Sequence, residues 1–144
     1  MYCPTWMPAP LDARIGGAYT DVESVGRDRS YLVSFIFKEE TQEVHVNFRG
    51  YPGRMRIPMC SDLDTGKHVP CFSDAKGTLR SGDITARAYT ANQGADQWHV
   101  LYAWRRNGSL YAISEHVAPP YDYAHVVRNL KRMLASLVLL EPKS

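Results

Sequence analysis

The stretch at residues 98–116, WHVLYAWRRNGSLYAISEH, constrains the fold of this chain more than any other part of the sequence. Two runs of alternating side chains flank Asn107-Gly108. Asn-Gly is typical of the tight type I′ hairpin turn, because both central residues of that turn need positive φ. Once these two residues fill the turn, counting outward fixes every facing pair. We therefore predict an antiparallel hairpin that places His99 opposite His116 at its open end.

The predicted register gives this hairpin two faces of different character. One face is small and flat, and we expect the C-terminal helix to lie across it; its residues are Leu101, Ala103, Leu110 and Ala112. The other face is aromatic, with Trp104 opposite Tyr111; its candidate ligand- or partner-binding residues are Trp98, Tyr102, Trp104 and Tyr111. Two interpretations of the aromatic face stay open. Either an N-terminal arm or a curled sheet covers it as core, or it is an exposed interaction surface.

The facing histidines are also the beginning of a metal site, but a useful site needs a third or fourth ligand. Glu115 points to the opposite face of the predicted hairpin, and His125 lies one helix away. No spacing supplies the missing ligands. We predict no metal and no cofactor.

The rest of the chain predicts further strands and one helix. Residues 30–39 and 41–50 form a second predicted hairpin, residues 54–60 an edge strand because of Pro58, and residues 83–92 another strand. Residues 60–82 are expected to form one long loop with a short strand near Val69. An apolar stripe predicts an α-helix after the Pro119-Pro120 pair, with Asp122 as its N-cap; the stripe is Tyr123, Val127, Leu130, Leu134 and Leu137.

These elements predict an α+β fold. We expect one domain over residues 1–144, with a twisted antiparallel sheet of about five to seven strands and one amphipathic C-terminal helix packed on one face. Residues 1–18 are rich in proline and are expected to form an extended N-terminal arm, from which Trp6 docks on the core.

The three cysteines bear on the compartment. Cys60 and Cys71 flank a polar, turn-rich segment, and a disulfide closing it would suit an oxidising environment. The alternative is two buried thiols in a reducing cytosol. We expect the disulfide and an extracytoplasmic location, with the cytoplasm as the alternative. Cys3 would then be left over on a mobile tail.

Composition and charge exclude several classes of function. The 144 residues are 44% hydrophobic and 22% charged, with a net charge of +2. The basic residues are scattered, whereas nucleic-acid binders gather them on one face, so we expect no nucleic-acid partner. No apolar run reaches the length that spans a bilayer. Asp64-Thr65-Gly66 matches the aspartic-protease signature, but its surroundings are polar and a second carboxylate is not specified, so we interpret it as a turn.

The segment at residues 103–142, AWRRNGSLYAISEHVAPPYDYAHVVRNLKRMLASLVLLEP, resembles the ending of small actinobacterial-type cell-envelope proteins with PsbP-like α+β domains. In these a sheet finishes in a hairpin, a loop and one amphipathic helix. The resemblance covers about the last third of the chain, and its motifs are structural. It implies an α+β domain outside the cytoplasm with an accessory or binding role, and it assigns no functional residue.

Three classes of function follow from these features. The preferred hypothesis is a non-enzymatic binding or accessory domain of the cell envelope, whose partner is a protein or a small molecule. The second is a small hydrolase with a site that the sequence does not reveal. The third is a structural domain that forms a homodimer through a strand edge or through the aromatic face.

Overall fold

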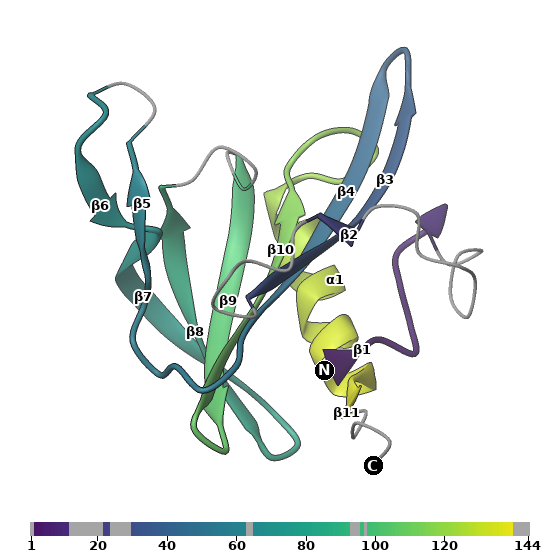
Figure 1. Ribbon diagram of the computed structural model, residues 1–144. Coiled ribbons are helices and arrows are strands. Elements are labelled where there is room, and N and C mark those ends of the chain that lie inside the picture. Colours follow the sequence, from purple (N-terminus) through teal and green to yellow (C-terminus); the bar gives the residue numbers. More distant parts are fainter. Residues whose placement is uncertain are drawn as a thin grey trace.

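The computed structural model describes residues 2–11, 22–23, 30–62, 65–92, 96 and 98–139. Its main feature is a seven-stranded antiparallel sheet with one C-terminal helix on one face, as the sequence predicts (Figure 1). In spatial order the strands are β2 (Val22–Glu23), β3 (Tyr31–Glu39), β4 (Gln42–Tyr51), β10 (Ser109–His116), β9 (His99–Arg106), β8 (Ile84–Ala91) and β7 (Phe72–Ser81).

The β9–β10 hairpin has the predicted register. Asn107 and Gly108 both have positive φ, at 49° and 76°, which is the backbone that a type I′ turn requires. Trp104 then pairs with Tyr111, and His99 pairs with His116. Local turn chemistry is therefore sufficient to set the pairing of these two strands.

Helix α1 (Tyr123–Ser136) begins at the predicted N-cap, because the Asp122 side chain accepts a hydrogen bond from the His125 amide. Its buried stripe is rotated from the predicted one and consists of Val126, Asn129, Leu130, Met133 and Leu134. Leu130 and Leu134 are buried as expected, whereas Tyr123 is exposed and Leu137 is half-buried.

The helix lies on the aromatic face of the hairpin, so its predicted position on the Leu/Ala face is wrong. Trp104, Tyr102 and Ile113 belong to the same buried cluster as Leu130 and Leu134. The neighbouring strand β4 explains why the helix packs on this face. Ile113 pairs with Phe48, which continues the aromatic face into a broad apolar surface; its further members include Val33, Phe35, Val44 and Val46. This surface offers a packed helix larger apolar side chains to bury than the Leu/Ala face does.

The N-terminal residues complete this side of the core. Strand β1 (Tyr2–Cys3) pairs with β11 (Val138–Leu139), which follows α1. Met7 and Leu11 are buried, and Arg132 of α1 lies over the Trp6 ring. The expected arm therefore packs on the core, and Cys3 lies in a strand rather than on a mobile tail. Residues 12–18 of that arm are outside the described part of the chain.

The opposite face carries a second, smaller core. Tyr51, Leu101, Leu110 and Ala112 are buried there beneath Cys71 and Phe72. The short hairpin of β5 (Met59–Ser61) and β6 (His68–Pro70) stands on this side, away from α1 (Figure 1). Two expectations were wrong here. Residues 54–58 are not a strand, and the expected long loop contains the ten-residue strand β7.

Candidate functional site

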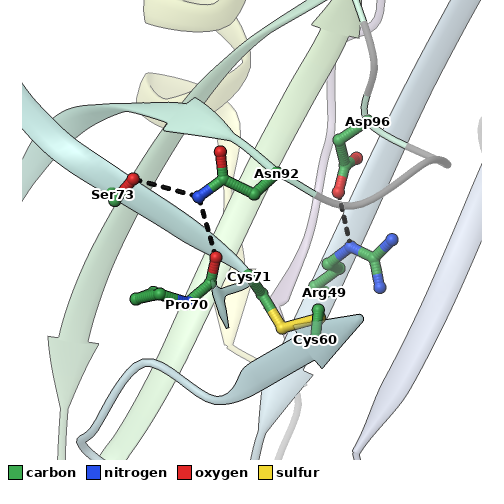
Figure 2. Close-up of a disulfide and its surroundings, with 7 residues drawn as sticks. All are labelled: Arg49, Cys60, Pro70, Cys71, Ser73, Asn92 and Asp96. Carbon is green, nitrogen blue, oxygen red and sulfur yellow. Dashed lines mark hydrogen bonds and ion pairs between the residues drawn. A yellow bond between two sulfur atoms is a disulfide. The ribbon is translucent and has the colours of Figure 1, made fainter. Parts of the chain in front are cut away.

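A buried carboxylate organises the polar half of the sheet face opposite α1. Asp96 lies between β8 and β9 and is 1% exposed. Its side chain accepts hydrogen bonds from Asn47 Nδ2 at 2.8 Å, Arg49 Nε at 2.9 Å and Ser114 Oγ at 2.7 Å. Figure 2 shows the contact with Arg49. Burial raises the pKa of Asp96, but the Arg49 guanidinium and these hydrogen bonds outweigh it and hold the pKa below its usual value.

Three histidines form a cluster whose central member, His99, lies next to this carboxylate. The ring centroid of His99 lies 4.7 Å from that of His45 and 5.4 Å from that of His116. His99 Nδ1 lies 2.8 Å from Ser114 Oγ, and since that hydroxyl donates to Asp96, the imidazole donates to Ser114. Burial lowers the pKa of His99 to about 3 and also lowers that of His45. Both rings are therefore neutral at physiological pH.

Glu43 lies at the outer side of the histidine cluster. Its carboxylate is 4.0 Å from His45 Nδ1 and 3.8 Å from His116 Nε2. Within the described ranges, no group of three or more His, Cys, Asp or Glu side chains has the arrangement of a metal site.

A cavity of about 410 Å³ opens beside this network. Strands β8 and β9 pair only where Arg87, Ala88 and Tyr89 face Ala103, Tyr102 and Leu101. Beyond Tyr89, β8 and β9 no longer pair, and the cavity lies at this end of the two strands. Its lining combines aromatic, hydroxyl and charged side chains, among them Tyr102, Tyr123, Lys76, Thr78, Thr90 and Asp96.

Trp98 stands at this cavity and is 80% exposed, the highest exposure among the large hydrophobic side chains described. Its backbone has φ of 62°, a conformation that costs a non-glycine residue about 1–3 kcal/mol. Its neighbours along the chain, Asp96 and His99, are tied into the buried network. The network therefore fixes the chain on both sides of the exposed indole.

The four predicted aromatic candidates fall into different environments. Tyr102 and Trp104 are core residues beneath α1. Tyr111 is half-buried and stacks on Trp104, and Tyr2 packs edge-on against both rings. Trp98 alone of the four is exposed. A binding role remains a prediction for these four residues. Because Trp98 is the exposed member, it is the strongest candidate among them.

The Cys60–Cys71 disulfide is present, with 4.9 Å between the two Cα atoms (Figure 2). Asn92 holds the adjoining chain by donating to the Pro70 carbonyl at 2.8 Å and to Ser73 Oγ at 3.0 Å. The disulfide consumes both thiols, so they offer no ligands for zinc. Of the predicted Asp64-Thr65-Gly66 turn, Asp64 lies outside the described residues, while Thr65 is in a turn and the Gly66 amide donates to the Asp62 carbonyl at 2.8 Å.

Sequence reasoning missed Asp96, Asn47 and Glu115 as members of polar clusters. The sequence did contain one signal for Glu115, because the alternation with Ile113 and Tyr111 places its carboxyl group on the apolar face of the predicted hairpin. Asp96 gave no signal, since it follows a turn-like segment and meets Asn47 and Arg49 only through the fold.

Comparisons of this chain with family models, with curated proteins and with solved structures give no match. No helix within the described ranges is long and apolar enough to span a membrane.

Proposed function

We propose that this chain is a non-enzymatic binding domain, and that a small ligand with a flat ring face occupies the cavity between β7, β8 and β9. The observation that carries this proposal is the exposed Trp98, held in a costly backbone conformation at the cavity. Exposed tryptophan provides a large contact area at little cost in side-chain entropy, and a cavity of about 410 Å³ suits a small molecule.

The side chains around the cavity favour a polar ligand. Thr78, Thr90 and the Tyr123 hydroxyl offer hydrogen bonds, while Leu79 and Val100 offer apolar contact. Asp96, the buried carboxylate of this lining, is already compensated by Arg49, so it supplies little attraction for a cation.

The polar network supports binding over hydrolysis. Ser114 Oγ donates to Asp96 and is buried, which leaves it poorly placed as a nucleophile although His99 lies beside it. The aromatic face is not available as a homodimer interface, because Tyr102 and Trp104 lie under α1.

We further propose an extracytoplasmic location. The Cys60–Cys71 disulfide suits an oxidising compartment, and the resemblance of residues 103–142 to PsbP-like envelope domains points the same way.

Fluorine NMR of protein labelled with 5-fluorotryptophan tests the binding site. The chain has three tryptophans, and a Trp98→Phe variant assigns the Trp98 resonance. Methyl β-glucoside and N-acetyltyrosinamide serve as saccharide and aromatic probes. We expect at least one probe to shift the Trp98 resonance saturably while that of the buried Trp104 stays in place.

The matched variants are Trp98→Ala and Met59→Ala. Both remove an exposed apolar side chain, but Met59 lies on β5, away from the cavity. Probe affinity, measured by calorimetry, should fall at least tenfold in the first variant and stay unchanged in the second. If neither probe shifts the Trp98 resonance at millimolar concentration, the proposed site is wrong.

A further inference from the structure

The Trp98 segment is held between the carboxylate and the histidine cluster. Asp96 and His99 flank Trp98 in the chain, and both are fixed by Ser114. The Trp98 carbonyl accepts a hydrogen bond from the Val117 amide at 2.9 Å. The position of the indole therefore depends on contacts that involve the His99 ring and the end of β10.

The surroundings of His99 oppose a positive charge on its ring. The His99 side chain is 1% exposed, and its Nδ1 lies 3.9 Å from Asp96 Oδ1, but the Arg49 guanidinium already pairs with that carboxylate. The groups that face the cluster are Asp96 between β8 and β9, Arg49 and His45 on β4, and His116 on β10. Glu43 of β4 faces His45 and His116.

From this arrangement we infer that the His45–His99–His116 cluster is an acid-sensitive latch on the Trp98 site. In acid, uptake of a proton by His99 favours a conformation in which the Trp98 segment leaves its place, and the cavity releases its ligand. This inference rests on the proposed function, because it assigns a regulation to the same site.

The size of the effect follows from linkage. Burial lowers the pKa of His99 to about 3, whereas a solvated histidine titrates near 6.5. When a group has a lower pKa in the closed segment than in solvent, it stabilises the closed segment at pH values above its solvated pKa. This stabilisation is lost as the pH falls toward the lowered pKa. For one such histidine, the ratio of open to closed segment rises about 30-fold from pH 7.5 to pH 5.0. The pKa of Asp96 is lowered as well, so its charge is retained over this range.

Hydrogen exchange of the Val117 amide measures the latch without a ligand. This amide is released when the Trp98 carbonyl moves away, so its protection reports the local opening. After correction for the intrinsic exchange rate, we expect protection at Val117 to fall about 30-fold from pH 7.5 to pH 5.0. Leu130, in the middle of α1, should stay better protected than Val117 at both pH values.

The matched variants are His99→Gln and His68→Gln. Glutamine can keep a hydrogen bond to Ser114 but takes up no proton, and His68 is exposed on the distant β6. The pH dependence at Val117 should disappear in the first variant and persist in the second. A pH-independent Val117 amide in the unmodified protein, equal protection at Val117 and Leu130, or an unaltered response in His99→Gln would each overturn the latch.

A measurement on the unmodified protein covers the case in which His99→Gln does not fold. The imidazole nitrogen shifts of His99 should remain those of a neutral ring in the closed protein down to pH 5. A titration of His99 near pH 6.5 with Val117 still protected would overturn the latch. Loss of probe binding at every pH, with Val117 still responding to acid, would overturn the proposed function alone.

Discussion

Asn129 of α1 donates a hydrogen bond to Glu115 of β10 across the main core, with 3.0 Å between Asn129 Nδ2 and Glu115 Oε2. Glu115 is 0% exposed, and its Oε1 has no hydrogen-bond partner among the described residues. Burial therefore raises the pKa of Glu115 to about 8, although the bond from Asn129 opposes the shift. The carboxyl group is protonated at neutral pH.

This raised pKa predicts a stability that falls as the pH rises. The contribution of Glu115 is fully present below pH 4.5, the ordinary pKa, and is lost as the pH rises toward 8. The slope is about 1.4 kcal/mol per pH unit for one proton. His99 acts in the opposite direction below pH 6.5, so the two effects partly cancel between pH 4.5 and 6.5.

Glu115→Gln separates the two effects. The variant keeps the shape of the side chain without an ionisable proton, so it should be more stable than the unmodified protein at pH 9. Its free energy of unfolding, from urea denaturation, should stay flat from pH 6.5 to 9 and decrease in acid because of His99 and His45. A variant that is less stable at pH 9 would contradict the burial of a protonated Glu115.

Tyr2 attaches the N-terminal strand to the aromatic face of the central hairpin. Its ring centroid lies 5.3 Å from that of Trp104 and 4.7 Å from that of Tyr111, both edge-on. We expect Tyr2→Ala to lower the free energy of unfolding by about 3–5 kcal/mol, as other aromatic deletions in cores do. Tyr2→Phe retains both ring contacts and should lose much less. Equal losses in the two variants, measured by urea denaturation, would contradict a packing role.

Gly50 on β4 faces Tyr31 on β3, and the Tyr31 ring occupies the space that a Cβ atom at position 50 would need. Gly50→Ala should therefore displace the ring and lower the free energy of unfolding by about 1–3 kcal/mol, the usual cost of overpacking. In a Tyr31→Ala background the same change should cost far less. A double-mutant cycle measures the difference, and additive losses would show that the ring does not exclude the methyl group.

The Cys60–Cys71 disulfide closes a loop with a sequence separation of 11. We expect Cys60→Ser to lower the free energy of unfolding by roughly 2–3 kcal/mol through loop entropy. Reduction should add the mass of two hydrogen atoms to the unmodified protein and to Cys3→Ser. No mass change in protein kept under oxidising conditions would remove the support for an oxidising compartment.

The central hairpin and the start of the helix could be predicted from the sequence because short-range chemistry sets them. Positive φ at Asn107 and Gly108 fixes the turn, the period of two then fixes each pair, and Asp122 caps α1 from within one turn. These interactions join residues that are near one another in the chain.

The placement of the helix and the makeup of the polar network were decided by the tertiary structure. The face that α1 covers depends on the register of Ile113 with Phe48, which joins strands far apart in the sequence. The same long-range pairing brings Asn47 and Arg49 beside Asp96, and leaves Trp98 exposed while Trp104 is buried. Sequence alternation specifies that a strand has two faces, but the surface that each face joins is determined only when distant strands compete to bury the most apolar area.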